Sequence, residues 1–292
     1  MLYFYGLGVG LESIARGRFS RETLKNVVVP ENYWRSLENR LTYRELNASS
    51  TDTVLDLGSP KLLSLYLADR VKAEVFSTDI EGYFLRDYTA FGRQKGVPES
   101  RFHVLEADGR KLPFPDNHFT RAYSISVLEH IPGTGDTECA REIGRTLKSG
   151  GICVITVPFS PESSEEYRKP SAFYWSGKSV KEPAPKSANV SANVSGGKSK
   201  NSDEPPRVFY QRRYSESDLH DRIIVPSGLR LKKAEFMGDR VARMNGKEIA
   251  YYLPRLAGPL HPILSRMFHA TPSESWKDMK NPLGALLVLE KP

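Results

Sequence analysis

From Thr53 onward the hydrophobic positions of the chain follow a regular pattern. Short apolar runs alternate with stretches of helical spacing, and this alternation predicts an α/β domain with a mostly parallel sheet. The apolar runs predict five strands over residues 53–58, 73–80, 101–107, 119–126 and 152–159. The stretches between them predict helices over residues 60–71, 82–95 and 137–147. The pattern resumes with a helix near residues 215–225 and strands near residues 229–237 and 284–290.

Three segments lie outside this pattern. Residues 1–50 carry aromatic residues and leucines among charged residues, which predicts one or two helices on the edge of the domain, next to its ligand cleft. Residues 161–207 are rich in Ser, Lys, Pro, Glu and Gly, and we expect a flexible insertion because burial cannot offset their ordering entropy. Within the C-terminal part, residues 208–292, we expect residues 238–281 to form a substrate-side cap. A basic membrane-surface element is the competing interpretation of that cap.

Length and charge limit the class of protein. The chain of 292 residues, 39% of them hydrophobic, is long enough for one α/β core of roughly 200 residues with peripheral segments. The formal net charge of +7 and the isoelectric point near 9.2 permit an anionic partner, such as nucleic acid, an acidic lipid surface or a phosphorylated substrate. A solvated basic surface explains the same charge.

Cysteine content and hydropathy favour a cytoplasmic protein. Cys139 and Cys153 are the only cysteines, and no metal-ligand spacing surrounds them, so we expect neither disulfides nor a zinc site. The apolar residues 1–11 lack preceding basic residues and a small-residue cleavage site, which argues against a secretory signal. No apolar window has the length of a bilayer span, while peripheral membrane contact stays open.

Acidic residues end three successive predicted strands: Asp56, Asp79 and Asp108. Because the carboxyl ends of parallel strands meet at one edge of a sheet, we expect these carboxylates to line one ligand cleft. Gly58 permits a tight turn there, and Ser59 provides a cap for the next helix. Asp79 is placed to accept from ribose hydroxyls and Asp108 from an exocyclic amine. Asp56 is placed to orient the turn or a ligand ammonium.

The turn after the first strand disfavours a dinucleotide. A dehydrogenase uses Gly-x-Gly-x-x-Gly to bring its backbone close to a pyrophosphate, whereas this chain has Gly58-Ser-Pro-Lys-Leu-Leu63. Pro60 also removes a backbone donor from the start of the helix. The cleft is therefore expected to hold an adenosine-containing ligand of another kind.

Five motifs together resemble one enzyme family. They are Val54-Leu-Asp-Leu-Gly58, Ser77-Thr-Asp-Ile80, Ala107-Asp-Gly-Arg-Lys-Leu-Pro-Phe-Pro-Asp116, Val127-Leu-Glu-His-Ile131 and Gly150-Gly-Ile-Cys-Val-Ile-Thr-Val157. They resemble the successive motifs of class I S-adenosylmethionine-dependent methyltransferases, and the Leu-Glu-His signature is closest to the small-molecule, type 11-like group. The resemblance covers residues 52–160. It implies a Rossmann-like, doubly wound sheet of seven strands with the last strand antiparallel.

The resemblance also implies roles for individual residues toward S-adenosyl-L-methionine. Asp79 would hold the ribose, and Asp108 with the backbone of Gly109 would hold the adenine. The full set of implied cofactor-binding residues is Asp56, Gly58, Ser59, Asp79, Ile80, Asp108, Gly109 and Ser126. The family usually has Gly-x-Gly-x-Gly after the first strand, and here Pro60 and Leu62 occupy the second and third glycine positions.

The implied reaction is an in-line methyl transfer, for which the protein aligns donor and acceptor and removes a proton where the acceptor requires it. His130 is the candidate base because imidazole titrates near neutrality, and a packing role is the alternative. Weaker candidates are Tyr123, His118 and Glu129. Tyr210, Tyr214, Tyr251 and Tyr252 are candidates for an acceptor pocket, and packing of helices and loops explains them as well. O-methylation of a small or medium-sized acceptor, lipid-like or anionic, is favoured, and no metal is expected.

Two other functions remain open. One is a catalytically silent, methyltransferase-like protein that binds a ligand or a partner, and the altered glycine turn favours it. The other is RNA methylation, which rests on the net charge alone.

Overall fold

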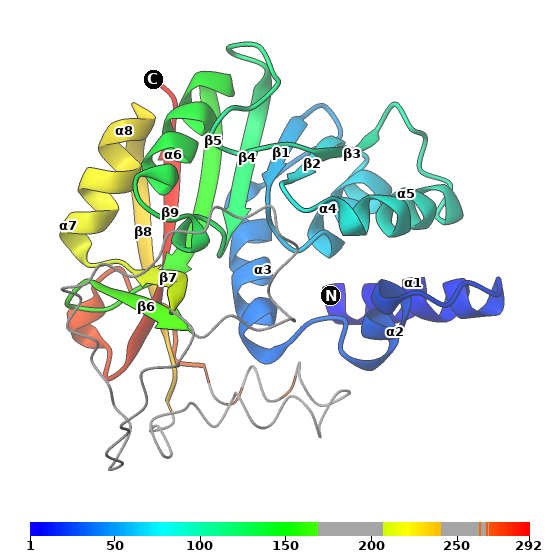
Figure 1. Ribbon diagram of the computed structural model, residues 1–292, viewed down its shortest axis with the longest axis horizontal. Helices are drawn as coiled ribbons and strands as arrows, with labels where there is room; N and C mark the ends of the chain where they lie inside the picture. Colours follow the sequence, from blue (N-terminus) through cyan, green and yellow to red (C-terminus); the bar gives the residue numbers. More distant parts are fainter. Residues whose placement is uncertain (169–206, 241–262, 264–266, 268) are drawn as a thin grey trace.

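Among the described residues, seven strands form one central sheet in the order β3-β2-β1-β4-β5-β9-β8 (Figure 1). The computed structural model describes residues 1–168, 207–240, 263, 267 and 269–292. Strands β1 to β5 pair in parallel, and β9 runs antiparallel to both of its neighbours. The strands are β1 (Thr53–Leu57), β2 (Glu74–Asp79), β3 (Phe102–Glu106), β4 (Phe119–Ile125), β5 (Leu147–Pro158), β8 (Arg230–Gly238) and β9 (Pro282–Glu290). This arrangement confirms the predicted fold class.

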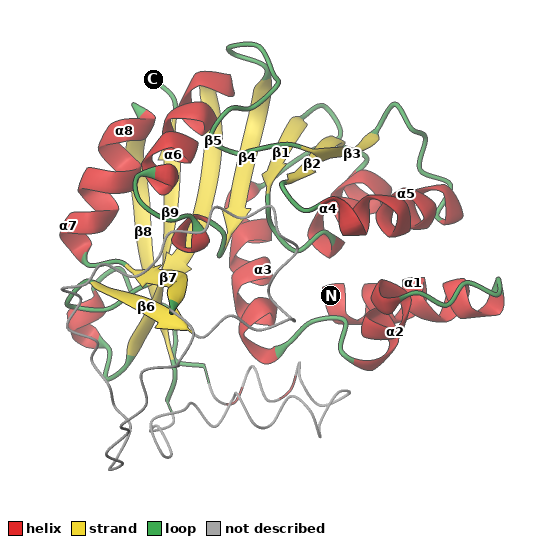
Figure 2. Cartoon of the chain, in the orientation of Figure 1, coloured by secondary structure: helices red, strands yellow, loops and turns green. Residues whose placement is uncertain are grey.

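Helices cover both faces of the sheet, so the strands read as nearly continuous apolar runs (Figure 2). Along β1, Val54 packs into the core on one face and Leu55 into the core on the other. The first core includes residues of α1 (Leu2–Ala15), α3 (Tyr33–Leu46), α4 (Leu62–Tyr66), η1 (Leu67–Val71) and α5 (Leu85–Gln94). The second core includes residues of η3 (Leu128–His130), α6 (Gly135–Thr146) and η4 (Leu219–Ile224). The other helical segments among the described residues are α2 (Arg21–Val28), η2 (Gly82–Phe84), α7 (Glu216–Asp218), α8 (Val225–Ser227) and η7 (Trp276–Asp278).

The N-terminal segment forms three helices where we expected one or two. Polar side chains cap two of them: the Ser20 side chain accepts from the Thr23 N–H at the start of α2, and Asn32 accepts from Arg35 at the start of α3. Asn47, at φ 42°, ends α3 in the left-handed conformation.

A second, two-stranded sheet lies beside the C-terminal end of β5. Strand β6 (Ser164–Arg168) pairs antiparallel with β7 (Val208–Arg213). Residues 164–168 belong to the segment that we expected to be flexible, and instead they form a paired strand. The rest of that insertion, residues 169–206, and most of the expected cap over residues 238–281 lie outside the described residues.

Candidate functional site

A cavity of about 210 Å3 lies at the carboxyl edge of β1, β2 and β4. Its walls come from the turn after β1, the ends of β2 and β4, and the N-terminal helices. The lining residues are Glu22, Lys25, Arg35, Gly58, Ser59, Pro60, Lys61, Asp79, Phe84, Tyr88, Ile125 and Ser126. Residues of α2 and α3 thus form one wall, so the N-terminal helices reach the expected ligand cleft.

The turn after β1 depends on Gly58. Its φ is 71°, which favours glycine, and its N–H donates to the Thr78 carbonyl oxygen at 2.8 Å. A Cβ at Gly58 would lie 2.6 Å from Cγ1 of Val127, so the position has no room for a side chain. The next residue, Ser59, is held by its own hydroxyl oxygen, which accepts the Ile125 N–H at 2.8 Å. Glycine at this point keeps the backbone close to the cavity.

Asp56 lies behind the turn, and it is not among the residues that line the cavity. Its side chain is fully buried and accepts from the Ser59 N–H at 3.0 Å, from the Ser77 hydroxyl at 2.8 Å and from the Ser64 hydroxyl. Of the two roles considered for Asp56, this geometry supports orientation of the turn.

Lys61 occupies a position that the sequence analysis did not single out. Its ammonium lies 3.4 Å from Oδ2 of Asp79 and 3.6 Å from Oδ2 of Asp56, and it donates to the Thr78 carbonyl oxygen at 2.8 Å. The side chain is only 4% exposed, and Nζ lies 4.8 Å from the centre of the Phe84 ring. Lys61 therefore places one buried positive charge between two carboxylates at the cavity wall.

Asp79 is the one strand-end carboxylate of the three that lines the cavity. Burial raises the pKa of Asp79, and the nearby ammonium of Lys61 opposes that rise. Its Oδ1 accepts the Glu81 N–H at 3.0 Å, and the side chain remains 21% exposed. Ile80, the next residue, is half-buried and is not part of the lining. The exposed part of Asp79 leaves acceptor capacity for a ligand hydroxyl.

Asp108 and Gly109 lie apart from the cavity lining. The guanidinium of Arg110 donates to both carboxylate oxygens of Asp108, with Nε at 3.0 Å from Oδ1 and Nη2 at 2.7 Å from Oδ2. These hydrogen bonds lower the pKa of Asp108. A Cβ at Gly109 would lie 3.0 Å from the Cys139 sulfur and 3.1 Å from Leu57, so this glycine permits close packing. A ligand amine at Asp108 would compete with Arg110.

Ser126 lines the cavity from the end of β4. It adopts φ 48°, a strained value for a residue with a side chain, and its hydroxyl donates to Oε1 of Glu38 at 2.6 Å. Thr156 of β5 donates to the same oxygen at 3.0 Å, and Arg35 donates to Oε2 at 2.8 Å. The buried carboxylate of Glu38 therefore fastens α3 to the ends of β4 and β5. No local sequence signal marks Glu38 for this role.

His130 lies in the Leu-Glu-His segment η3, and its orientation follows from one contact. Nδ1 lies 2.8 Å from the carbonyl oxygen of Tyr210. Because a carbonyl oxygen can only accept, Nδ1 carries the hydrogen and Nε2 of the neutral ring is an acceptor. Partial burial lowers the pKa of His130, which favours the neutral ring. His130 is not among the residues that line the cavity.

Glu129 is the nearest carboxylate to this ring, with Oε1 3.7 Å from Nε2 of His130. Glu129 is 1% exposed, and burial raises its pKa to about 8, although the charge of Arg35 opposes the rise. Within the described residues its Oε2 has no hydrogen-bond partner. Near neutral pH the pair is therefore a protonated carboxyl beside a neutral imidazole.

The other candidates for proton transfer have structural contacts. Tyr123 is fully buried, and its hydroxyl lies 2.6 Å from that of Ser64. The ring of His118 stacks on Phe114 with 5.9 Å between ring centres. Neither side chain lines the cavity.

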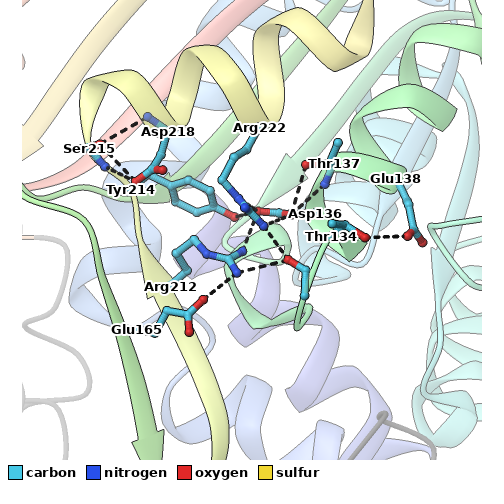
Figure 3. Close-up of polar contacts among 11 residues, drawn as sticks. Thr134, Asp136, Thr137, Glu138, Glu165, Arg212, Tyr214, Ser215, Asp218 and Arg222 are labelled. Atoms are coloured by element: carbon cyan, nitrogen blue, oxygen red, sulfur yellow. Dashed lines mark hydrogen bonds and ion pairs between the residues drawn. The ribbon is translucent and has the colours of Figure 1, made fainter. Parts of the chain in front are cut away.

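A buried ionic cluster around Asp136 holds the strand that supports His130 (Figure 3). Asp136 is fully buried and accepts from Arg212 at 2.7 Å, from the Tyr214 hydroxyl at 2.9 Å, and from Nε and Nη2 of Arg222 at 2.8 Å each. Arg212 also donates to Glu165 of β6 at 2.8 Å. Tyr214 therefore belongs to this cluster and not to an acceptor pocket, while Tyr251 and Tyr252 lie outside the described residues.

The chemistry of the residues around the cavity suits an adenosine-containing ligand. Asp79 offers an acceptor for the sugar hydroxyls, and the backbone at Gly58 and Ser59 is open to close approach by the ligand. The left-handed Gly58 turn has no room for a Cβ, so ligand and backbone can approach closely. Four of the eight predicted cofactor residues line this one cavity: Gly58, Ser59, Asp79 and Ser126.

Comparisons with known proteins identify the family of the sheet domain. Residues 55–155 match the family model described as a methyltransferase domain. The ubiquinone/menaquinone biosynthesis C-methyltransferase UbiE of Shewanella sp. (strain W3-18-1) is 33% identical over 99 residues, which are 34% of this chain and 38% of that protein. The 2-phytyl-1,4-naphtoquinone methyltransferase of Nostoc punctiforme is 35% identical over 137 residues, 42% of this chain and 56% of the relative. The matches thus span less than two thirds of either relative.

A solved structure resembles the chain over nearly its whole length. The crystal structure of the (4+2)-cyclase SpnF superposes with a TM-score of 0.55 and 17% sequence identity, covering 99% of this chain and 94% of the cyclase. At this identity the likeness concerns the fold alone. In the part of the chain that the structure describes, no helix has both the length and the apolar character of a membrane span.

Proposed function

The chain contains a class I S-adenosylmethionine-dependent methyltransferase domain, as its motifs predicted, and on this premise we propose that it methylates a small, largely apolar acceptor. The single observation that carries the proposal is the cavity at the carboxyl edge of β1, β2 and β4, where Gly58, Asp79 and Ser126 meet. This is the edge at which open α/β sheets bind their ligands.

In this proposal different residues of the cavity contact different parts of the cofactor. Asp79 accepts from the ribose hydroxyls, and the backbone at Gly58 and Ser59 faces the methionine end. Lys61 offsets the charge of Asp79 and suits the cofactor carboxylate better than its ammonium. Asp108 can contact the adenine only if Arg110 yields one of its hydrogen bonds. When bound, S-adenosyl-L-methionine supplies an activated methyl group.

The protein's chemical contribution is alignment and removal of a proton. Nε2 of His130 is an unprotonated acceptor when Nδ1 donates to Tyr210, so it is set up to take a proton from an acceptor hydroxyl. Glu129, buried beside it at 3.7 Å, is a neutral carboxyl near neutral pH, and its ionised form stabilises the positive charge that the ring carries after taking a proton. His130 is therefore the proposed base, and Glu129 is the proposed positioning residue.

The names of the relatives suggest a class of methyl acceptor. The names of the two relatives described above both refer to quinones, and one is named as a C-methyltransferase. A phenol or enol loses its hydroxyl proton to give an anion that is nucleophilic at oxygen and at the adjacent carbon. We infer an acceptor of this class. Analysis of the product by NMR distinguishes the O-methyl compound favoured by the sequence from the C-methyl compound favoured by the relatives.

Isothermal titration with S-adenosylhomocysteine tests the first step. Asp79→Ala should weaken binding by about 1–3 kcal/mol, or roughly 5- to 150-fold, through lost hydrogen bonds to an ionised acceptor. Asp116→Ala is the matched control, because Asp116 is 68% exposed and outside the cavity lining. Equal affinity in both variants would show that the ribose is held elsewhere.

The alternative function is a methyltransferase-like protein that does not transfer methyl groups. The altered glycine turn favours it. Absence of heat with both S-adenosylmethionine and S-adenosylhomocysteine would support this alternative. RNA methylation has only the net charge in its favour, and a salt-dependent gel shift tests it.

A further inference from the structure

Exposed apolar side chains gather in the first 28 residues of the chain. Ten large hydrophobic side chains are prominently exposed among the described residues, and six of them belong to α1, α2 and their flanks. We call these six the N-terminal apolar surface: Met1, Phe4, Leu11, Phe19, Leu24 and Val28. Phe4 is 68% and Phe19 70% exposed, which is costly for aromatic side chains in water. An exposed group of this kind marks an interaction site.

Helix α1 presents this surface along one continuous stripe. Its exposed positions 1, 4, 8, 11 and 15 fall within an arc of about 80° at roughly 100° per residue. These positions hold Met, Phe, Gly, Leu and Ala, so the outward stripe carries no charge and no hydrogen-bonding side chain. The opposite side holds Leu2, Val9 and other buried residues of the core. Packing among the described residues explains the inner stripe and leaves the outer one unexplained.

The stripe adjoins a strongly basic loop. Arg16-Gly-Arg-Phe-Ser-Arg21 connects α1 to α2 and has three arginines, no acidic residue and the exposed Phe19. On α2 the exposed Lys25 stands next to Leu24, while Glu22 is buried. Basic and aromatic side chains alternating with aliphatic ones are typical of helices that lie in the interface of an anionic bilayer.

Close packing fixes the two helices against each other and against the sheet domain. A Cβ at Gly10 would lie 2.7 Å from Cγ2 of Val27, and a Cβ at Gly6 would lie 2.7 Å from Cβ of Pro30. The hydroxyl of Ser13 donates to Gln94 of α5 at 2.7 Å. The apolar stripe is therefore held on a fixed support and does not need to fold upon contact with a partner.

We propose that the N-terminal apolar surface docks the protein on an anionic lipid bilayer. Two of the four basic residues of this segment, Arg16 and Lys25, form ion pairs with Glu12 and Glu22. The other two, Arg18 and Arg21, complement acidic headgroups, and the phenylalanines and leucines enter the acyl boundary. A second copy of the chain would bring these cations together, which disfavours self-association. The proposal stands independently of the methyl-transfer reaction.

Docking at this surface also relates to the cavity. Glu22 and Lys25, which line the cavity, belong to the same helix as the exposed Leu24 and Val28. A bilayer contacting the outer side of α2 thus lies one helix away from the ligand cavity. If the proposed function holds, an acceptor dissolved in the bilayer has a short route to the site.

Vesicle flotation with the full chain tests the proposal. Vesicles of phosphatidylcholine with one third phosphatidylglycerol should carry the protein upward, and vesicles of pure phosphatidylcholine should carry at least about tenfold less. The double variant Phe4→Ser/Leu11→Ser should bind vesicles at least about tenfold more weakly, because it removes two apolar side chains that would enter the bilayer. Val225→Ser is the matched control, since Val225 is 58% exposed on a different part of the molecule.

The charge component has its own pair of variants. Arg21→Glu should weaken binding to anionic vesicles, whereas Arg86→Glu, at a side chain that is 88% exposed outside this surface, should not. Equal flotation of all variants, or flotation of none, overturns the proposal. A dimer in light scattering that Phe4→Ser/Leu11→Ser dissolves would assign the surface to self-association instead. Titration with S-adenosylhomocysteine, unchanged in all four variants, separates this result from any failure of the proposed function.

Discussion

Replacing Asp136 by alanine should destabilise the fold more than any other single carboxylate change in the C-terminal half of the domain. The carboxylate is fully buried and accepts hydrogen bonds from two arginines and one tyrosine (Figure 3). Arg212 is only 6% exposed, so the variant would leave a buried guanidinium with Glu165 as its remaining acidic partner. Removing one member of a buried pair costs about 3–5 kcal/mol.

The parts of this cost can be separated. Arg222 is 25% exposed, so water can replace part of the contact that it loses. Its contribution to the loss of stability is therefore smaller than that of Arg212. The Tyr214 hydroxyl loses a hydrogen bond worth about 1–2 kcal/mol in a buried site. Asp136→Asn keeps an acceptor and the side-chain shape while removing the charge, so its loss should lie between that of Asp136→Ala and zero.

Urea unfolding followed by circular dichroism measures these losses. Glu138→Ala is the control on the same helix, because Glu138 is half-buried and accepts only from the Thr134 hydroxyl at 2.9 Å. It should change the free energy of unfolding by less than about 0.5–1 kcal/mol. If Asp136→Ala lost no more than Glu138→Ala, the cluster would contribute nothing to stability, and the assignment of β7 as a strand fixed through Asp136 would be refuted.

Two further changes test the site itself. Gly58→Ala should lower stability by about 2–4 kcal/mol through left-handed strain and contact with Val127, and Val127→Ala in the same chain should restore only the steric part, as thermal unfolding would reveal. Burial raises the pKa of Glu129 from its ordinary 4.5 to about 8, so the unfolded chain releases this proton first and the folded state loses stability as pH rises through that window. As pH rises from 5 to 8.5, the free energy of unfolding of Glu129→Gln should therefore increase by more than ~1 kcal/mol relative to that of the wild type, as urea unfolding would measure. The same pH dependence of stability in both proteins would contradict a neutral Glu129.

The sheet and its ligand-binding edge follow from the sequence because they depend on local patterns. The apolar run of β1, the glycine that ends it and the acidic residue at the end of β2 place Gly58 and Asp79 at one edge of a parallel sheet. The same argument correctly places Asp56 and Asp108 at this edge of the sheet, but neither of them lines the cavity. Serine hydroxyls enclose Asp56, and Arg110 engages Asp108.

The rest of the site depends on contacts between residues far apart in the chain. Nothing in the sequence near Glu38 indicates that its carboxylate accepts hydrogen bonds from the hydroxyls of Ser126 and Thr156. These residues follow Glu38 by 88 and 118 positions. Lys61 reads as an ordinary helix-start lysine, and only the fold directs its ammonium between two aspartates. Such contacts have no periodicity, so hydrophobic patterning and motif spacing cannot predict them.

The position of β9 has a consequence for how the chain matures. Pro282–Glu290 inserts between β5 and β8, and its Leu286 and Leu287 enter the cores on the two sides of the sheet. During synthesis β5 and β8 leave the ribosome before the strand that joins them, so they cannot yet pair through it. Until residue 290 has emerged, the nascent chain therefore exposes unpaired edges of β5 and β8 that can pair with other polypeptides. Binding of chaperones to the nascent chain should be strongest in that interval.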